Sequence, residues 1–420
     1  MKKDIPEKLE PSLVEEAYGR INEVIIKTSL RLNKTLSARF GATIYLKRED
    51  LQPVRSYKVR GAYNRTSLLT PQERKKGVVC ASAGNHAQGV AFSCARLGIK
   101  GFVYMPKNTP RQKINRVRAL GEKWITLTLV GDNFDEAFKN AKAFCTKTGK
   151  TFIHPFDDLH VIAGQGTIGI EILDQLGRSP DFVLVPIGGG GLISGLGSYL
   201  KFKDERIQII GVEPVGAPSM AESLKAGKVV TLPKVDTFVD GVAVKTVGAH
   251  TFAIARRVID TMLLVPEGKV CQEMISLYQN DGLVTEPAGA LSVSALEEMK
   301  DKIRGKTVVC VISGGNNDIS RYTEIIERSL VYQGLKHYFV IEFSQRPGAL
   351  RTYLNDVLGS TDDITFFEYV KKNNRENGPA LVGIELAKKT DLEPLLRRMN
   401  KAGLTYELLR SDSPVFRFLM

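Results

Sequence analysis

The chain has 420 residues, enough for two or three domains, and its 43% hydrophobic and 25% charged content is ordinary for a globular protein in water. Its net charge is +13, but the basic residues are scattered and a dense run such as Arg74-Lys75-Lys76 is short and lacks interleaved aromatics, so we expect no nucleic-acid partner. No apolar run approaches transmembrane length, no apolar signal core follows Met1, and the five cysteines show no C-x-x-C spacing, so we expect a cytoplasmic protein without a membrane partner.

Lys58 lies in the first informative segment, Ser56-Tyr57-Lys58-Val59-Arg60-Gly61-Ala62. A lysine amine condenses with an aldehyde to form a Schiff base, but only when the amine is neutral. We expect burial and the neighbouring cations Arg55 and Arg60 to lower the pKa of Lys58.

A polar turn follows the buried strand pattern of residues 78–82. It consists of Ser82-Ala83-Gly84-Asn85-His86 and opens a helix predicted over residues 86–97. Free N–H groups at such a turn suit a substrate carboxylate, and the Asn85 amide can donate to a ring oxygen. Taken alone, Ser82 and Asn85 are also ordinary helix caps, and His86 is best interpreted as a packing residue.

Four glycines, at 188–191, separate a buried strand predicted over residues 181–187 from a helical run over residues 192–200. Consecutive N–H groups without Cβ atoms at a helix start form a nest for an anion. A flexible linker is less favoured because no polar spacer flanks the run. A dinucleotide site is also less favoured, because the run is not G-x-G-x-x-G.

Ser313 ends a third buried strand, predicted over residues 307–312. With the amine, the polar turn and the anion nest, its hydroxyl completes a set that fits pyridoxal phosphate. A hydroxyl at the pyridine nitrogen, unlike a carboxylate, does not hold that nitrogen protonated, and this favours β-elimination over transamination.

These motifs, in this order and spacing, resemble the short biosynthetic threonine dehydratases (threonine deaminases). The resemblance spans most of residues 20–320 and includes Leu46-Lys47-Arg48-Glu49-Asp50, Ala163-Gly164-Gln165-Gly166-Thr167 and Thr285-Glu286-Pro287-Ala288-Gly289-Ala290. A second match, Arg346-Pro347-Gly348-Ala349-Leu350, lies in the C-terminal part. The resemblance implies an α/β fold of the tryptophan synthase β type, which is fold type II of the pyridoxal-phosphate enzymes.

The same resemblance implies residue roles. Lys58 corresponds to the Schiff-base lysine, Asn85 to the partner of the phenolic oxygen, and Ser313 to the partner of the pyridine nitrogen. We expect the amine of Lys58 also to remove the α-proton. Ser82, Ala83 and Gly84 correspond to the loop for the substrate carboxylate. The phosphate loop corresponds to Gly188, Gly189, Gly190, Gly191 and Leu192.

The implied activity is conversion of L-threonine to 2-oxobutanoate and ammonia, the first step of isoleucine biosynthesis, with some dehydration of L-serine. Isoleucine and valine are the implied effectors, and the implied assembly is a homo-oligomer, expected to be a tetramer. A serine dehydratase or a serine racemase, with Ser82 as the acid on the opposite face, stays open. So does a catalytically silent amino-acid sensor, although the intact set around Lys58 argues against it.

A divalent cation site is not expected. Relatives that bind such ions use a glutamate and an aspartate after a strand, and here Glu213 is present while Ser219 stands in the place of the aspartate. A monovalent ion held by carbonyls stays open, and the five histidines show no ligand spacing.

Two domains are predicted: a catalytic part over residues 1–330, with a small mobile lobe at about 70–155, and a C-terminal part over residues 335–420. The second part alternates in a βαββαβ order, with strands at 335–344, 364–370, 380–386 and 405–409 and helices at 349–358 and 391–401. By resemblance it is one ACT-like regulatory domain. A module that serves only assembly is the alternative.

Overall fold

A computed structural model describes residues 5–369, 376–410 and 413–419. The chain forms two compact units, Met1–Asp318 and Ile319–Met420. Within the described ranges, no helix is long and apolar enough to cross a membrane.

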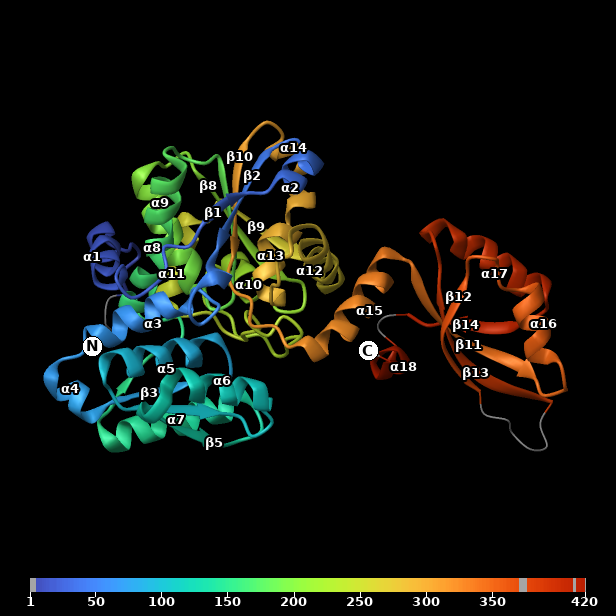
Figure 1. Cartoon of the computed structure of the whole chain (residues 1–420), viewed down its shortest axis with the longest axis horizontal. Helices are drawn as coiled ribbons and strands as arrows, with labels where there is room; N and C mark the ends of the chain where they lie inside the picture. The colour runs from blue at the N-terminus through green and yellow to red at the C-terminus, as the bar shows by residue number, and fades with distance from the viewer. Residues whose placement is uncertain (1–4, 370–375, 411–412, 420) are drawn as a thin grey trace. The chain divides into compact units, whose positions relative to one another are not determined.

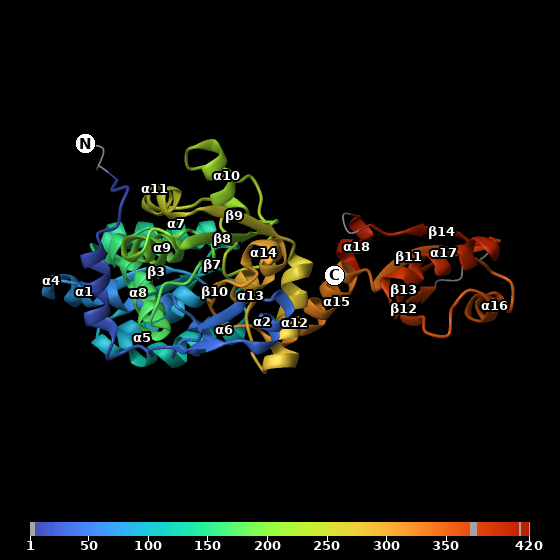
Figure 2. The same ribbon diagram turned by 90° about the horizontal axis from the view of Figure 1, so that it is seen from above.

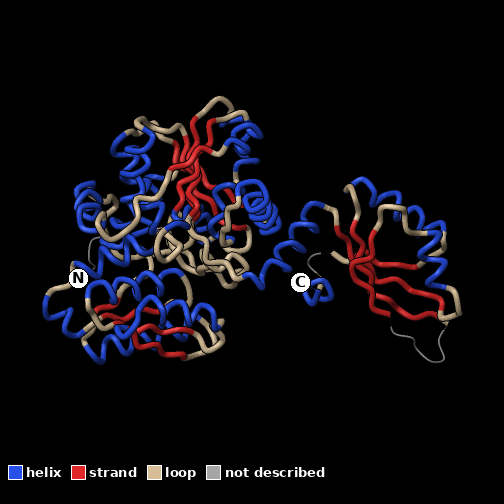
Figure 3. Tube along the Cα trace, viewed as in Figure 1, coloured by secondary structure: helices blue, strands red, loops and turns tan. Residues whose placement is uncertain are grey.

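The first unit is built on a six-stranded sheet with the order β1-β2-β10-β7-β8-β9 (Figures 1 and 3). Its strands are parallel except β1, which pairs antiparallel with β2. β10 is buried at every position, as expected for a central parallel strand covered on both faces. The strands are β1 (Leu30–Leu32), β2 (Thr43–Arg48), β7 (Phe182–Pro186), β8 (Gln208–Pro214), β9 (Thr261–Val265) and β10 (Thr307–Ile312).

Helices cover both faces of this sheet. In Figures 1 and 2, α8 and α9 lie on one side and α12, α13 and α14 on the other. α8 and α9 approach closely because Gly195 has no side chain. A Cβ at this position would lie only 2.1 Å from the carbonyl oxygen of Ile162. The helices are α1 (Pro11–Ile21), α2 (Lys34–Phe40), α3 (Lys58–Ser67), α8 (Leu159–Leu176), α9 (Gly191–Lys203), α10 (Ser219–Ala226), α11 (Ala249–Val258), α12 (Glu267–Asp281), α13 (Pro287–Ser294), α14 (Leu296–Ile303) and the short 3-10 turn η1 (Glu49–Leu51).

A smaller parallel sheet, with the order β5-β4-β3-β6, forms a separate lobe inserted between β2 and β7. Its core is apolar and includes Val78, Val90 and Val103. The elements of this small lobe are α4 (Pro71–Lys76), β3 (Val78–Ala81), α5 (Asn85–Leu97), β4 (Gly101–Met105), α6 (Arg111–Gly121), η2 (Glu122–Trp124), β5 (Ile125–Leu129), α7 (Phe134–Thr148) and β6 (Thr151–Phe152).

A buried ion cluster joins β2, η1, α3 and α8. The Arg60 guanidinium donates to Glu49 and to Glu171, at 2.8 Å each, and the Lys47 ammonium donates to Glu171 at 2.5 Å. All four side chains are fully buried. Burial opposes the charged form of each group, but the ion pairs prevail. Glu49 and Glu171 raise the pKa of Arg60, and Arg60 lowers the pKa of Glu49. The cluster therefore fixes the helix that begins at Lys58.

The second unit is a four-stranded antiparallel sheet with the order β12-β13-β11-β14. Numbered within the unit, this order is 2-3-1-4, the ferredoxin-like layout that was predicted. Its core includes Phe339, Val382 and Leu395. The elements are η3 (Ile319–Arg321), α15 (Tyr322–Gln333), β11 (Lys336–Ser344), α16 (Ala349–Asp356), β12 (Asp363–Tyr369), β13 (Asn377–Glu385), η4 (Lys389–Asp391), α17 (Leu392–Lys401), β14 (Thr405–Leu408) and α18 (Pro414–Leu419).

Two boundaries of this unit differ from the expected ones. α15 falls in the second compact unit, whereas the sequence placed most of it in the catalytic part. β13 begins at Asn377, three residues before the start of the strand predicted over residues 380–386. The predicted end of the preceding strand, Val370, lies outside the described residues.

Candidate active site

The predicted site residues meet where the small lobe faces the large sheet. A cavity of about 300 Å³ is lined by Lys58, by the turn of Ser82, Ala83, Gly84 and Asn85, and by Gly189. The carboxyl ends of β3, β7 and β10 supply the turn, the glycine run and Ser313, as expected for a ligand site in a parallel α/β sheet. The predicted residues that lie outside this cavity wall are Gly188, Gly190, Gly191, Leu192 and Ser313.

Lys58 is the first residue of α3, and its Nζ donates to the carbonyl oxygen of Pro155 at 2.9 Å. Burial lowers the pKa of Lys58 from 10.5 to about 8, while the nearby Glu286 opposes this shift. The amine is therefore close to the neutral form that a nucleophile and a base require.

The expected contribution of the two arginines to this shift is wrong. Burial is its main cause, and neither arginine is among its causes. Arg60 is neutralised within the buried ion cluster by Glu49 and Glu171. Arg55 is exposed, so water screens its charge.

A chain of side-chain hydrogen bonds crosses the cavity. Asn316 Nδ2 donates to Asn85 Oδ1 at 2.7 Å, and Asn85 Nδ2 donates to Glu286 Oε1 at 2.7 Å. This leaves Asn85 one further amide hydrogen, which is the donor that the predicted contact with a ring oxygen needs.

Glu286 was quoted as part of a motif, but no role was predicted for it. It precedes Pro287 at the start of the fully buried α13, and burial raises the pKa of its carboxyl to about 7. Asp240 adds to this rise, while the bonded Asn85 and the cation of Lys113 oppose it. An acidic residue before a helix without any charged side chain was the signal available in the sequence.

The turn of residues 82–84 leads into a helix start, and the N–H of Ser82 donates to the carbonyl oxygen of Tyr104 at 3.1 Å. α5 begins at Asn85, one residue earlier than predicted, and no side chain caps it. The Ser82 hydroxyl instead accepts from the N–H of Gly84 at 3.1 Å. The cap interpretation of Ser82 and Asn85 is therefore wrong, and an anion can bind at this helix start.

His86 packs as predicted. Its Nε2 lies 2.9 Å from the carbonyl oxygen of Ile153, and burial lowers the pKa of the ring to about 3. The ring is neutral at physiological pH.

The glycine run has the geometry of an anion cradle. Gly190 has φ = +92° and precedes α9, which has no side-chain cap. A Cβ at Gly189 would lie 2.2 Å from the Phe156 ring, and one at Gly190 would lie 2.7 Å from Met220 Cε. Thr251 Oγ1 donates to the carbonyl oxygen of Gly189 at 2.6 Å and fixes the loop. These contacts exclude a flexible linker, and the cradle fits a phosphate.

Ser313 is buried at the end of β10, where its hydroxyl donates to the carbonyl oxygen of Ala288 at 3.2 Å. Its own carbonyl oxygen accepts from the N–H of Tyr57 at 3.1 Å, next to Lys58. Arg55, two residues before Tyr57, has φ = +56°, an uncommon backbone conformation for a residue other than glycine. The loop at Ser313 and the start of α3 are thus joined by backbone contacts.

Glu213 caps a helix. Its two carboxylate oxygens accept from the N–H groups of Met220 and Ala221 at 2.8 and 2.9 Å, and the Ser219 hydroxyl donates to the carbonyl oxygen of Val244. Across the part of the chain that the structure describes, no three His, Cys, Asp or Glu side chains form a group suited to a metal ion.

Two family models and many curated proteins match the chain. A family described as pyridoxal-phosphate dependent enzyme matches residues 21–314, and one described as the C-terminal regulatory domain of threonine dehydratase matches residues 327–419. The chain is 54% identical over 405 residues to the biosynthetic L-threonine dehydratase IlvA of Bacillus subtilis (strain 168), covering 96% of each protein. It is 51% identical to the protein of the same name in Lactococcus lactis subsp. lactis (strain IL1403), covering 97% of this chain and 99% of that one.

Solved structures also resemble the chain. The processed form of threonine deaminase isoform 2 from Solanum lycopersicum aligns with a TM-score of 0.72 at 41% identity, covering 77% of this chain and 95% of that one. A serine racemase from maize aligns with a TM-score of 0.71 at 30% identity, covering 77% of this chain and 98% of that one.

Proposed function

The chain belongs to the pyridoxal-phosphate dependent enzymes and, among them, to the biosynthetic threonine dehydratases, and from this premise we propose which of its residues hold the cofactor and carry out the reaction. The protein is a threonine ammonia-lyase that forms 2-oxobutanoate and ammonia from L-threonine in isoleucine biosynthesis. Pyridoxal phosphate, when bound, supplies the electron-withdrawing ring that makes the α-hydrogen of the amino acid acidic.

Four groups of this chain hold the cofactor. Lys58 would form the covalent bond to its aldehyde carbon, Asn85 would donate to its ring oxygen and Ser313 would face its pyridine nitrogen. The phosphate lies in the cradle made by Gly188, Gly189, Gly190, Gly191 and Leu192. The observation that carries this assignment is the lowered pKa of Lys58, an amine in the same cavity wall as Asn85 and Gly189.

The remaining residues act on the substrate. The turn of Ser82, Ala83 and Gly84 binds the α-carboxylate at the uncapped start of α5. The Ala83 N–H points to this role most directly, because the Ser82 N–H donates to Tyr104 and the Gly84 N–H donates to the Ser82 hydroxyl. Lys58, with a pKa of about 8, is partly neutral near pH 7 and accepts the α-proton on Nζ. The hydroxyl of Ser313 carries no charge, so it would not hold a pyridine nitrogen in the protonated form, and this would favour loss of the β-hydroxyl over transamination.

The test is reduction of the purified holoenzyme with borohydride, followed by peptide mapping. We expect the cofactor to be fixed on Lys58, and we expect Lys58→Ala to keep its circular dichroism spectrum while losing keto-acid formation from threonine. A reduced adduct on another lysine would overturn the assignment. Parallel assays with L-serine, including chiral analysis of the remaining serine, measure serine dehydration and racemisation.

We propose that the regulatory effectors bind to the second unit. A cavity of about 240 Å³ in it is lined by the predicted motif Arg346-Pro347-Gly348-Ala349-Leu350 together with Phe343, Phe367 and Tyr369. Its size and apolar rings suit a branched aliphatic amino acid. Isoleucine should bind here and raise the half-saturating threonine concentration, and valine should oppose it, with a coupling of about 1–3 kcal/mol.

This part of the proposal includes assembly and environment. A single regulatory domain in each chain calls for a homo-oligomer, which we propose to be a tetramer in the cytoplasm. A monovalent cation held by carbonyl oxygens is part of the same proposal. Sedimentation with and without isoleucine tests the assembly.

A further inference from the structure

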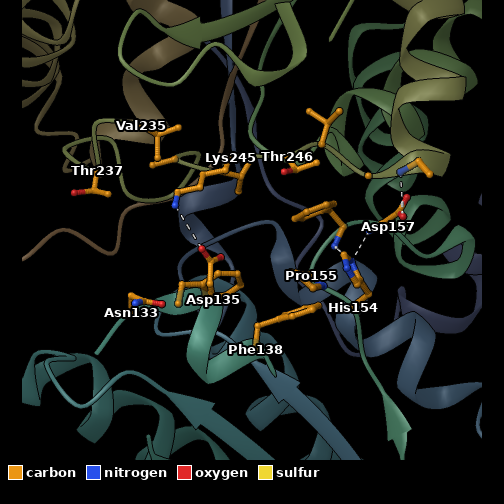
Figure 4. A pocket seen from close by; sticks show the side chains of 17 residues that line it. Asn133, Asp135, Phe138, His154, Pro155, Asp157, Val235, Thr237, Lys245 and Thr246 are labelled. Carbon is orange, nitrogen blue, oxygen red and sulfur yellow. Dashed lines mark hydrogen bonds and ion pairs between the residues drawn. The ribbon is translucent and has the colours of Figure 1, made fainter. Parts of the chain in front are cut away.

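A second and larger cavity lies beside the catalytic one. It measures about 620 Å³ and opens between α7 of the small lobe and the coil of residues 227–248 that joins α10 to α11 (Figure 4). None of the residues assigned to the cofactor or to the substrate carboxylate lines it. We name it the outer chamber.

The outer chamber adjoins the catalytic cavity. Six residues line both spaces, so their side chains and backbone form the wall between them: Phe134, Pro155, Phe156, Thr237, Ala243 and Val244. Five of the six belong to coil segments rather than to helices or strands, and three of these lie in the coil of residues 227–248. A small shift of the lobes or of this coil can therefore join the two spaces.

Two of the four titratable side chains that line the outer chamber are committed to the fold. Asp157 accepts from the N–H groups of Ala249, His250 and Thr251 at the start of α11. His154 Nδ1 accepts from the N–H of Asp157 at 2.8 Å, and burial lowers the pKa of that ring to about 4, so it is neutral.

The other two titratable residues, Asp135 and Lys245, face each other across the lobes. Lys245 Nζ lies 3.5 Å from Asp135 Oδ2, and the two side chains are 46% and 70% exposed. Figure 4 shows Lys245 reaching down from the coil toward Asp135 at the start of α7. Such an exposed pair is weak and exchanges readily with other ions.

A second ion pair across the lobes lines the catalytic cavity, with the cation and the anion on the opposite lobes to those of the first pair. There the small lobe supplies the cation Lys113 and the coil supplies the anion Asp240, at 2.5 Å. Each space therefore has a pair of one cation and one anion across the lobes, and such a pair can bind the carboxylate and the ammonium of an α-amino acid.

We propose that the outer chamber is an entry site that binds the substrate as a zwitterion before it reaches Lys58. The ammonium pairs with Asp135 and the carboxylate with Lys245, while Phe134, Phe138 and Val235 contact the aliphatic side chain. The ligand class is small aliphatic α-amino acids. The substrate then passes Phe134 and Phe156 into the catalytic cavity.

The first test fills the outer chamber. Thr246 and Val235 line this chamber and not the catalytic cavity, so Thr246→Trp and Val235→Trp are measured separately as holoenzymes. We expect kcat/KM for threonine to fall at least tenfold in each, with kcat changed less than twofold and cofactor absorbance retained. The control is Lys234→Trp, an exposed position on the same coil that does not line the chamber. Values of kcat/KM within twofold of this control in both variants would overturn the proposal.

The second test removes the charges. We expect Lys245→Gln and Asp135→Asn each to lower kcat/KM about three- to tenfold, with kcat retained, and the control Lys234→Gln to change it less than twofold. In the double variant, the dependence of kcat/KM on salt should flatten, because no charged entry site is left to screen. A rise of kcat/KM in the single variants would mean that the ion pair only holds the lobes together, and the binding role would then fall.

Discussion

Lys58 and Glu286 line one cavity, and burial brings their pKa values toward each other, from 10.5 to about 8 and from 4.5 to about 7. Burial disfavours the charged form of each, so the amine loses its proton more easily and the acid holds its proton longer. Near neutral pH both groups can therefore exchange protons, which suits a site that must take up and release an α-proton.

Glu286 should make the stability of the cofactor-free protein depend on pH. Its carboxyl keeps its proton up to about pH 7 when folded but loses it near 4.5 when unfolded, so the free energy of unfolding falls as pH rises through this window. The fall amounts to at most about 3 kcal/mol. Glu286→Gln should flatten it, as measured by urea unfolding between pH 5 and 8.

The control for this experiment is Glu298→Gln, an exposed position on α14. It should leave the pH profile of the wild-type protein unchanged. If the Glu286→Gln profile ran parallel to that of the wild type, Glu286 would not carry the shifted proton.

Gly190 and Gly227 form a matched pair for the phosphate cradle. Both have positive φ, +92° and +66°, but a Cβ at Gly190 would meet Met220 and Thr251, whereas one at Gly227 would meet open space. Gly227→Ala should cost only the backbone strain of about 1–2 kcal/mol. Gly190→Ala should, in addition, weaken cofactor binding at least tenfold in a fluorescence titration. Equal affinities for the two variants would argue against the cradle.

Among the elements, α3 and α8 are joined through the buried ion cluster. Glu171 neutralises both Lys47 and Arg60, so Glu171→Gln leaves buried positive charge uncompensated. We expect a loss of about 3–5 kcal/mol in the free energy of unfolding. The exposed pair Arg20–Glu16 on α1 is the control, where Glu16→Gln should cost no more than about 1 kcal/mol. Similar losses would mean that the cluster is solvated.

The elements that the sequence predicted well are those with a local signature. β10 is an unbroken apolar run, and the glycine run stands directly between a strand and a helix, so both could be found without a structure. The contact of Asn85 with Glu286 joins residues 201 positions apart, and no local pattern encodes it. The neutralisation of Arg60 was also missed, because Glu171 lies 111 positions away and Glu49, 11 positions away, belongs to a different element.

At the scale of the whole molecule, the two compact units indicate a better position for truncation than the boundary at residue 330 that the sequence predicted. A cut after Leu330 would split α15, whereas a cut after Asp318 follows the boundary between the units. The chain ended at Asp318 should keep threonine dehydratase activity and lose its response to isoleucine. Steady-state kinetics with isoleucine, together with calorimetry, measure both.

The full-length chain is the control, and it should bind isoleucine. Inhibition of the truncated enzyme by isoleucine would place the effector site in the first unit. If isoleucine did not bind to the intact oligomer, the second unit would serve assembly alone.

The strand order of the large sheet determines when its strands can pair while the chain is being synthesised on the ribosome. β2 emerges early, but one of its two neighbours is β10, whose Ile312 pairs with Arg48. At ~5–20 residues per second, β2 therefore waits on the order of ten seconds or more for that neighbour. The small lobe, whose strands are all encoded between Val78 and Phe152, is complete long before then. A nascent chain therefore carries a finished lobe beside an unfinished sheet edge, and this open edge can pair with other chains until β10 covers it.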